Sequence, residues 1–235
     1  MRYAAALVLV VFAGGVTGAD ADPVAECADA ISRSDWEAAV AACTKAAEQG
    51  DAMVQTALGV MYDEGQGVPE NDAKAVEWYT KAAEQGYALA QSDLGRMYAD
   101  GEGVPVDYAK AIEWYVKAAE QGDAYGQRLL SFMYVTGKGV PVNEAKGLEW
   151  LMKAAEQGDA HAQYELAKVY GNGRYGVPKD KVRAFMWLSL ADSLGHEDAA
   201  EARNFLGNRM RRKQIVKAEQ LAREWSERYN AKHGY

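Results

Sequence analysis

Apolar side chains recur along this chain at the three- and four-residue spacing of amphipathic helices, in stretches separated by glycine and proline. In residues 88–98 one helix face holds Ala88, Gln91, Leu94, Gly95 and Tyr98. In residues 108–121 one face holds Ala111, Trp114, Tyr115 and Ala118. The pattern therefore predicts two helices of similar length, each with one side to bury.

The residues between these two helices predict a tight connection. Gly101 suits the left-handed position that ends a helix, and Gly103-Val104-Pro105 forms a turn that no helix can continue through. Asp107 is placed to cap the second helix, since its carboxylate can accept hydrogen bonds from the first free N–H groups. The unit is a helix–turn–helix hairpin.

The hairpin is repeated in register. Copies occupy residues 51–86, 87–122 and 123–158, and a copy one residue longer occupies residues 159–195. Residues 20–50 form a degenerate N-terminal capping repeat, and residues 196–235 form a partial repeat followed by a basic capping helix. A single hairpin cannot bury its tryptophan and tyrosine alone, so the copies must stack. We expect an all-α fold with one continuous solenoid core.

The repeated string AxAQxxLGxMYxxGxGVPxDxxKAxEWYxKAAEQG resembles the Sel1-like repeat, a longer-looped relative of the tetratricopeptide repeat. The match covers roughly residues 24–225. The resemblance implies a right-handed α/α solenoid that binds a protein or peptide partner. Members of the family are typically adaptors or regulators in the bacterial envelope and in host contact, and a cysteine-rich branch has been linked to penicillin binding.

Residues 1–19 have the pattern of a signal peptide. Arg2 precedes an apolar run over residues 4–12, and Thr17-Gly18-Ala19 forms a small-residue cleavage site. The run is too short to span a bilayer, so we predict no transmembrane segment in the mature chain. An uncleaved N-terminal anchor is the alternative. The pattern favours an exported protein that is periplasmic or secreted.

The two cysteines of the chain are placed symmetrically about a predicted turn. Cys27 lies eight residues before Asp35 and Cys43 lies eight residues after it. In a tight antiparallel helix pair such residues lie side by side, and in an oxidising compartment they would form a disulfide. Two buried free thiols are the alternative.

Charge is unevenly distributed. After cleavage the chain carries 25 basic and 34 acidic residues, a net charge of −9, which makes nucleic acid a poor candidate for a partner. Residues 208–235 have eight basic and three acidic residues, a net charge of +5, with a cluster at Arg209, Arg211, Arg212 and Lys213. Pairing with acidic repeat helices is one interpretation. The other is a structural envelope component that binds an anionic surface through this basic helix.

In tetratricopeptide-like stacks the first helices line the concave groove. The resemblance therefore indicates the positions of these helices that vary between copies as candidate binding residues. They are Met53, Val60, Leu89, Arg96, Tyr125, Arg128, Phe132, His161, Tyr164 and Lys168. Aromatic and arginine side chains are common at interface hot spots, and this set would suit an acidic, partly apolar segment. A variable solvent-facing surface without a partner is the alternative.

Other recurring side chains are predicted to be structural. Aromatic residues recur at two registers, Trp78, Trp114, Trp150 and Trp187, and Tyr62, Tyr98, Tyr134 and Tyr170. Because every copy has them on the predicted buried stripe, we expect core packing rather than a carbohydrate or cofactor strip. Gln55, Gln91, Gln127 and Gln163 are expected to bind buried backbone groups near the turns.

The chain has few residues suited to catalysis. Its three histidines have no metal-ligand spacing, and two cysteines sixteen residues apart do not make a zinc site. Ser-x-x-Lys, Ser-Asp-Asn and Lys-Thr-Gly are absent, which argues against the activity linked to the cysteine-rich branch. We predict a non-enzymatic binding scaffold with no cofactor, no metal and no catalytic residue. The sequence leaves the partner and the oligomeric state open.

Overall fold

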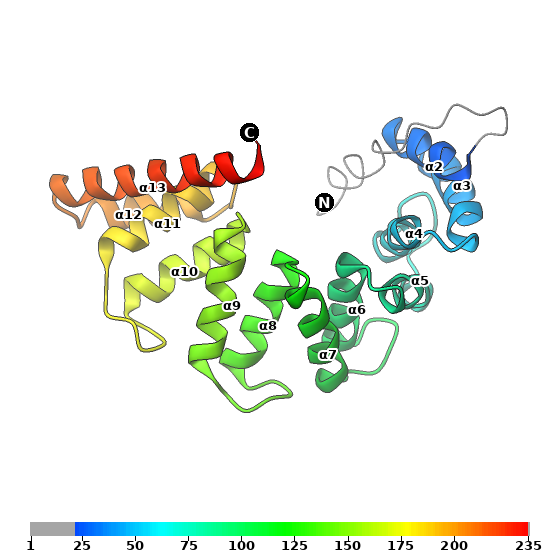
Figure 1. Cartoon of the computed structure of the whole chain (residues 1–235), viewed down its shortest axis with the longest axis horizontal. Coiled ribbons are helices and arrows are strands. Elements are labelled where there is room, and N and C mark those ends of the chain that lie inside the picture. Colours follow the sequence, from blue (N-terminus) through cyan, green and yellow to red (C-terminus); the bar gives the residue numbers. More distant parts are fainter. Residues whose placement is uncertain (1–21, 235) are drawn as a thin grey trace. The chain divides into compact units, whose positions relative to one another are not determined.

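The computed structural model describes residues 22–234, and the predicted signal peptide lies outside them. Within this range the chain forms twelve helices and no strand, which confirms the all-α repeat fold (Figure 1). The helices are α2 (Pro23–Ser32), α3 (Trp36–Glu48), α4 (Ala52–Glu64), α5 (Asp72–Glu84), α6 (Ala88–Asp100), α7 (Tyr108–Glu120), α8 (Ala124–Thr136), α9 (Glu144–Glu156), α10 (Ala160–Asn172), α11 (Lys181–Ser193), α12 (Ala199–Gly207) and α13 (Arg212–His233).

The helices belong to two compact units. The N-terminal unit ends at Gln121 and contains α2 to α7, each packed on the next. The C-terminal unit begins at Gly122 and contains α8 to α13, in which α11 packs against α10, α12 and α13. Where the sequence predicts one continuous core, the contacts divide the chain at the end of the second repeat.

Local chemistry sets the ends of the helices. The second helix of every full hairpin begins after a side chain that accepts a hydrogen bond from a backbone N–H of the first turn, and the four capping residues are Asn71, Asp107, Asn143 and Asp180. The helix α6 ends at Gly101, whose φ of 78° is left-handed. Both features agree with the sequence pattern.

In the N-terminal unit a tyrosine ring packs against a bare stretch of helix. A Cβ atom added at Gly59 would lie 2.6 Å from the ring of Tyr79, and one added at Gly95 would lie 2.6 Å from the ring of Tyr115. Both tyrosines are fully buried. Glycine lets the two helices of each hairpin approach closely enough to enclose the ring.

The prediction that the repeated tryptophans pack in the core is confirmed only in part, because Trp78 and Trp114 pack against the apolar clusters of the N-terminal unit without being buried. Trp78, Trp114 and Trp150 are only half-buried, and a lysine ammonium three residues further on lies 3.8–3.9 Å from each ring centroid. Trp187 alone of the set is buried. The residue after each tryptophan points about 100° further round the helix, and this second position faces the core. Tyr62, Tyr98 and Tyr134 are likewise half-buried, whereas Tyr170 is buried.

The first hairpin is joined covalently. Cys27 of α2 and Cys43 of α3 form a disulfide, the pairing that their spacing predicts. Both residues are buried in the apolar cluster that also includes Leu58 of α4. The bridge thus holds together the first hairpin, which among the described residues packs on α4 through α3.

A series of glutamine side chains connects successive repeats. Gln55 Nε2 donates to the carbonyl of Ala47, and Gln91 and Gln163 make the same bond to Ala83 and Ala155. A second glutamine, at the end of each following helix, then donates to the first: the pairs are Gln85 to Gln55, Gln121 to Gln91, and Gln157 to Gln127. We call this series the glutamine relay. It satisfies buried polar groups at the repeat junctions, as the sequence predicts.

The glutamine relay stops in the fourth repeat. Leu194 occupies the position of Gln157, and its side chain is half-exposed. Gln163 is completely buried, and its Oε1 atom receives no hydrogen bond from any residue that the structure describes. The fourth repeat therefore contains an acceptor without its usual donor.

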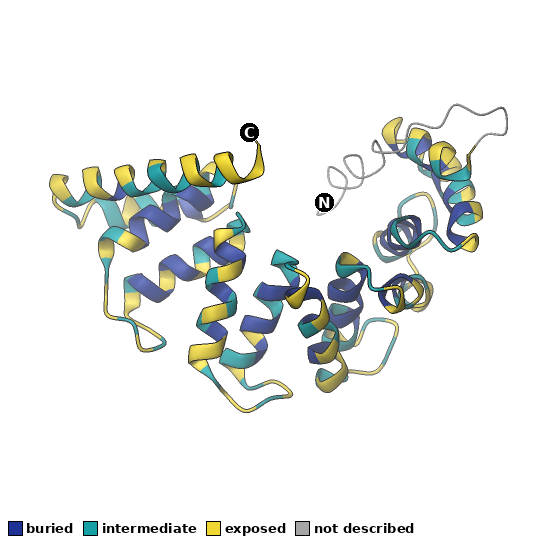
Figure 2. Cartoon of the chain, viewed as in Figure 1, coloured by how far each residue is buried: buried dark blue, intermediate teal, exposed yellow. Residues whose placement is uncertain are grey.

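The long helix α13 closes the C-terminal unit. Ile215, Leu221 and Trp225 pack against a cluster of buried residues to which α9, α10 and α11 all contribute. Figure 2 shows exposed residues along the outer side of α13 and buried residues on α11. None of the helices in residues 22–234 combines the length and the apolar character needed to cross a membrane.

We expect the substitution Leu194→Gln to extend the relay and raise the free energy of unfolding by about 1 kcal/mol, because a buried acceptor gains a donor. Urea unfolding of the purified protein measures this. Gln121→Leu is the matched control and should cost about 1–3 kcal/mol, because it leaves Gln91 Oε1 without its donor. An unchanged stability in both variants would contradict the role of the relay.

Candidate functional site: a pocket between α8, α9 and α10

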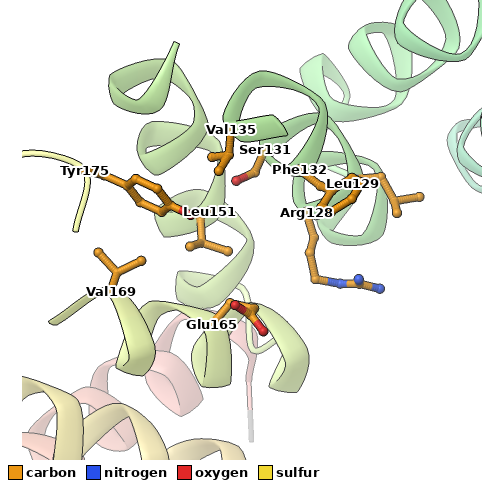
Figure 3. A pocket seen from close by; sticks show the side chains of 9 residues that line it. All are labelled: Arg128, Leu129, Ser131, Phe132, Val135, Leu151, Glu165, Val169 and Tyr175. Carbon is orange, nitrogen blue, oxygen red and sulfur yellow. The ribbon is translucent and has the colours of Figure 1, made fainter. Parts of the chain in front are cut away.

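The C-terminal unit contains a pocket of about 360 Å³ (Figure 3). The first helices of two neighbouring repeats, α8 and α10, supply most of its lining, with one residue each from α9 and from the loop after α10. The lining residues are Arg128, Leu129, Ser131, Phe132, Val135, Leu151, Glu165, Val169 and Tyr175. Figure 3 shows Leu151 between Tyr175 on one side and Phe132 on the other, with the Arg128 guanidinium directed away from Leu151. The pocket is thus mainly apolar.

The pocket lies where the third repeat departs from the first two. Ser131 stands at the position of Gly59 and Gly95, and Leu151 stands at the position of Tyr79 and Tyr115. The glycine–tyrosine packing of the N-terminal unit is therefore absent here. A leucine side chain ends well short of the place that a tyrosine ring would reach, which leaves space between the helices.

In the N-terminal unit polar contacts close the equivalent space. The hydroxyl of Tyr79 donates to Asp63 Oδ2 over 3.2 Å, and the Arg96 guanidinium bridges Asp63 and Glu102. Burial raises the pKa of the Asp63 carboxyl above its ordinary value, although Arg96 and the Tyr79 hydroxyl both act to lower it. This carboxyl is thus partly desolvated and held between two donors.

The C-terminal unit lacks this closure. Val135 stands at the position of Asp63, and Lys168 stands at that of Arg96. Without a carboxylate opposite it, the Lys168 ammonium pairs with Glu165 on its own helix, at 2.6 Å. The inner end of the pocket is consequently apolar, whereas the equivalent end in the N-terminal unit is charged.

Further substitutions in the third repeat form the pocket wall. The Ser131 hydroxyl donates to the carbonyl of Gly147 over 2.7 Å, in a buried position. A Cβ atom added at Gly147 would lie 2.5 Å from a methyl group of Val135. The packing of Val135 therefore requires glycine at 147, and the Ser131 hydroxyl is already committed to an acceptor within the fold.

Tyr175 comes from the loop that contains the extra residue of the fourth repeat. Its φ is 57°, in the left-handed region that few residues other than glycine adopt. Its side chain packs against the core of the C-terminal unit and lines the pocket. A strained backbone persists only where the surroundings hold it, and such positions cluster at binding sites.

The predicted binding residues are distributed over both units. Arg128 and Phe132 line the pocket, whereas Tyr125, His161, Tyr164 and Lys168 lie on the same two helices outside the lining. Leu89 and Arg96 belong to the N-terminal unit. Met53 is half-buried there.

One of these predictions is wrong. Val60 is only 3% exposed and packs with Leu94 and Met97 in the core, so it cannot face a groove. The residues of α4 from Val54 to Met61 are all buried, because α4 contacts both α3 and α5 and its variable face is covered as well.

The cations assigned to an acidic partner already have partners within the chain. Arg128 Nε lies 3.3 Å from an Asp159 carboxylate oxygen, and its guanidinium also lies over the ring of Tyr125. Lys168 is paired with Glu165. The positive charge near the pocket is therefore largely balanced by the protein's own carboxylates.

Three rings on α10 and the turn after α11 lie together. The ring centroids of Tyr164 and His196 are 4.2 Å apart and stacked, and those of His161 and His196 are 4.8 Å apart. These contacts attach the start of α10 to the next turn. Nowhere in residues 22–234 do three or more histidine, cysteine, aspartate or glutamate side chains gather as metal ligands would.

Most of the lining residues were missed by the sequence analysis. They are Leu129, Ser131, Val135, Leu151, Glu165, Val169 and Tyr175. A signal for the pocket was nevertheless present, because Ser131 and Leu151 break a pairing that the first two copies share. The sequence analysis searched for variable positions on one helix and did not compare pairs of positions across a hairpin.

The basic cluster lies at the start of α13 and is separate from the pocket. Arg209, Arg211, Arg212 and Lys213 are all exposed, and none of them forms an ion pair with the residues described here. The Arg209 guanidinium lies 3.6 Å from the ring centroid of the exposed Phe205. The predicted pairing with acidic helices is therefore not present in the structure.

A family model for the Sel1 repeat matches this chain four times, at residues 52–87, 88–123, 124–159 and 160–196. Together these matches cover more than half of the sequence. None of the curated proteins compared with the chain matches it.

Solved structures with the same fold come from several bacteria. A Sel1 repeat protein from Oxalobacter formigenes is 38% identical with a TM-score of 0.67; the match covers 79% of this chain and 55% of that protein. A putative Sel1 repeat protein from Klebsiella pneumoniae subsp. pneumoniae is 22% identical with a TM-score of 0.53. This match covers 79% of this chain and 93% of that protein. The immunity protein Pa5087 from Pseudomonas aeruginosa is 22% identical with a TM-score of 0.55. This match covers 91% of this chain and 83% of that protein. The last two likenesses concern the fold alone.

We expect Leu151→Tyr alone to destabilise the C-terminal unit by about 1–3 kcal/mol, because the ring would meet the Cβ of Ser131. Adding Ser131→Gly should recover most of this loss, since the pair then matches Gly95 and Tyr115. Urea unfolding of the wild type, both single variants and the double variant gives the coupling energy. Additive effects would contradict our explanation of the pocket.

Proposed function

The chain belongs to the Sel1 repeat family, and on this premise we propose that it is an exported scaffold that binds a segment of a partner protein at the pocket between α8 and α10. Solenoids of Sel1 repeats are generally non-enzymatic binding scaffolds, and we propose the same for this chain. The observation that carries the proposal is the open apolar pocket on the helices that the resemblance assigns to partner binding.

Exposed side chains at the pocket mouth support a protein partner. Phe132 is 50% exposed although it is a large aromatic residue. Lys138 lies over its ring, with the ammonium 5.2 Å from the centroid. Aromatic side chains on a pocket rim are typical of the few residues that dominate protein interfaces.

The disulfide supports export. Bridges of this kind persist in oxidising compartments such as the periplasm and are rare in a reducing cytosol. The bridge between Cys27 and Cys43 is therefore consistent with the leader pattern in residues 1–19, which lies outside the described residues. We propose a periplasmic or secreted location.

We expect the double substitution Tyr125→Ala and Phe132→Ala to abolish binding of the partner while the melting temperature changes little, because both side chains are at least partly exposed. A photo-reactive phenylalanine analogue at position 132, incorporated in the native organism, identifies the partner by covalent capture. The same analogue at position 205, another exposed phenylalanine, is the control. Identical adducts from both positions, or loss of the fold in the double variant, would contradict the proposal.

The proposed export, with cleavage of the leader and formation of the disulfide, can be tested separately. Intact-mass measurement of protein from the periplasm or the medium should give a chain that begins at Asp20 and carries no free thiol under denaturing, non-reducing conditions. A chain that still begins at Met1 would contradict the cleavage, and two reactive thiols would contradict the bridge.

The basic cluster of α13 supports a second candidate function, attachment to an anionic surface. Four exposed cations without acidic partners stand beside the exposed apolar side chains of Phe205 and Val216. Lysine and arginine near an anionic lipid surface each contribute about 1 kcal/mol, and exposed apolar side chains can enter the interface.

We expect the full-length mature protein to bind vesicles that contain anionic phospholipid and to be released as salt rises, because exposed charges are screened within a Debye length. Charge reversal at Arg211 and Arg212 should abolish this binding. Co-sedimentation at 50 and 500 mM NaCl measures it, with purely zwitterionic vesicles as the control. Binding that is independent of salt would remove this candidate.

A further inference from the structure

The pocket occupies the place where this chain lacks one of its own aromatic side chains. In the first two full hairpins that place holds Tyr79 or Tyr115, each completely enclosed. In the third hairpin it holds Leu151, and the space remains open to the surface. We propose that the partner fills this space with an aromatic side chain without a hydroxyl group, that is, a phenylalanine. The inference rests on the proposed function and specifies what the pocket recognises.

The size of the pocket agrees with this occupant. Its volume of about 360 Å³ lies within the range of sites that bury a small organic group. A single ring would fill the part next to Leu151, and the remainder would hold the backbone and a neighbouring side chain of the partner. An aliphatic group of smaller area would leave part of the lining uncovered, and the uncovered lining atoms would have no contacts with the occupant.

The lining favours a ring over an aliphatic chain. Phe132 and Tyr175 stand on opposite sides of Leu151 in Figure 3, and both offer ring surfaces to an inserted group. Pairs of aromatic rings attract each other edge to face or offset, beyond the effect of the area they bury. Leu129, Val135 and Val169 complete an apolar surround.

The side chain at the inner end of the pocket favours an occupant without a hydroxyl group. The hydroxyl of Tyr79 donates to Asp63, but the equivalent position here is Val135. A tyrosine hydroxyl placed as that of Tyr79 would therefore meet the methyl groups of Val135 and lose its water without gaining an acceptor there. We expect tyrosine to bind about tenfold more weakly than phenylalanine.

Charge contributes little to this recognition. Arg128 is paired with Asp159, and Lys168 with Glu165, so a partner carboxylate would have to compete with existing pairs. Contacts between apolar surfaces are not screened by salt. Binding at the pocket should therefore change less than about threefold between 50 and 500 mM NaCl, since only exposed charge pairs are sensitive to ionic strength.

A random-peptide display library tests the inference on the intact mature protein. Peptides are selected on the wild type and counter-selected on the Ser131→Gly/Leu151→Tyr double variant, whose new ring fills the pocket. We expect the surviving peptides to share a phenylalanine. Replacement of that residue by tyrosine, leucine or alanine in a synthetic peptide should weaken binding about tenfold, about tenfold and at least a hundredfold, measured by fluorescence anisotropy.

Matched variants separate the outcomes. Val135→Phe blocks the inner end by a second route and should also abolish binding, whereas Val106→Ala removes an exposed apolar side chain in the N-terminal unit and should leave binding unchanged. Pocket-dependent peptides that lack an aromatic residue, or that prefer tyrosine, would overturn the inference and leave the proposed function standing. If no peptide survives the counter-selection, or if the survivors bind Val135→Phe as well as the wild type, both the inference and the proposed pocket are wrong.

Discussion

The close approach of two helices around an enclosed ring is the constraint on which this structure depends. Tyr79 and Tyr115 fit between their helices only because Gly59 and Gly95 have no side chain in the way. The energetic gain comes from burying a large aromatic surface against backbone, and it fixes the separation of the helices in each hairpin. A change on either side of this pairing alters both, so the partner positions must change together. Ser131 and Leu151 are such a joint change, and its result is a pocket instead of a core.

The elements of the fold could be predicted from the sequence because their causes are local. Asp107 caps a helix by its own carboxylate, and Gly101 ends one by its own backbone conformation. The incomplete burial of Trp114 has a different origin. A periodic pattern identifies the buried side of a helix only to within about one residue, and Tyr115 next to it is the enclosed ring. Val60 failed because the helix that carries it is covered on both sides, which depends on neighbours that are distant in sequence.

The candidate site was predictable only in part. Arg128 and Phe132 were found since they vary on a helix face, but a pocket is a missing volume, and no single residue encodes it. The pocket and the basic cluster also differ in their physical chemistry. Around the pocket the charges are paired, so the recognition that we propose there depends on shape. At the start of α13 the exposed cations have no ion pair with the described residues, so an anionic partner would be attracted at long range.

The glutamine relay has a consequence for how such a chain can change in length. Each first glutamine donates to a carbonyl of the preceding copy and accepts from a glutamine of its own copy. A duplicated hairpin inserted between the third and fourth copies would therefore find an acceptor at the Ala155 carbonyl and a donor at Gln163. In the fourth copy itself Gln163 lacks this second donor, because Leu194 has no amide to offer it. The fourth copy is therefore the poorer template for duplication, and a protein engineer who lengthens the chain would copy one of the first three hairpins instead.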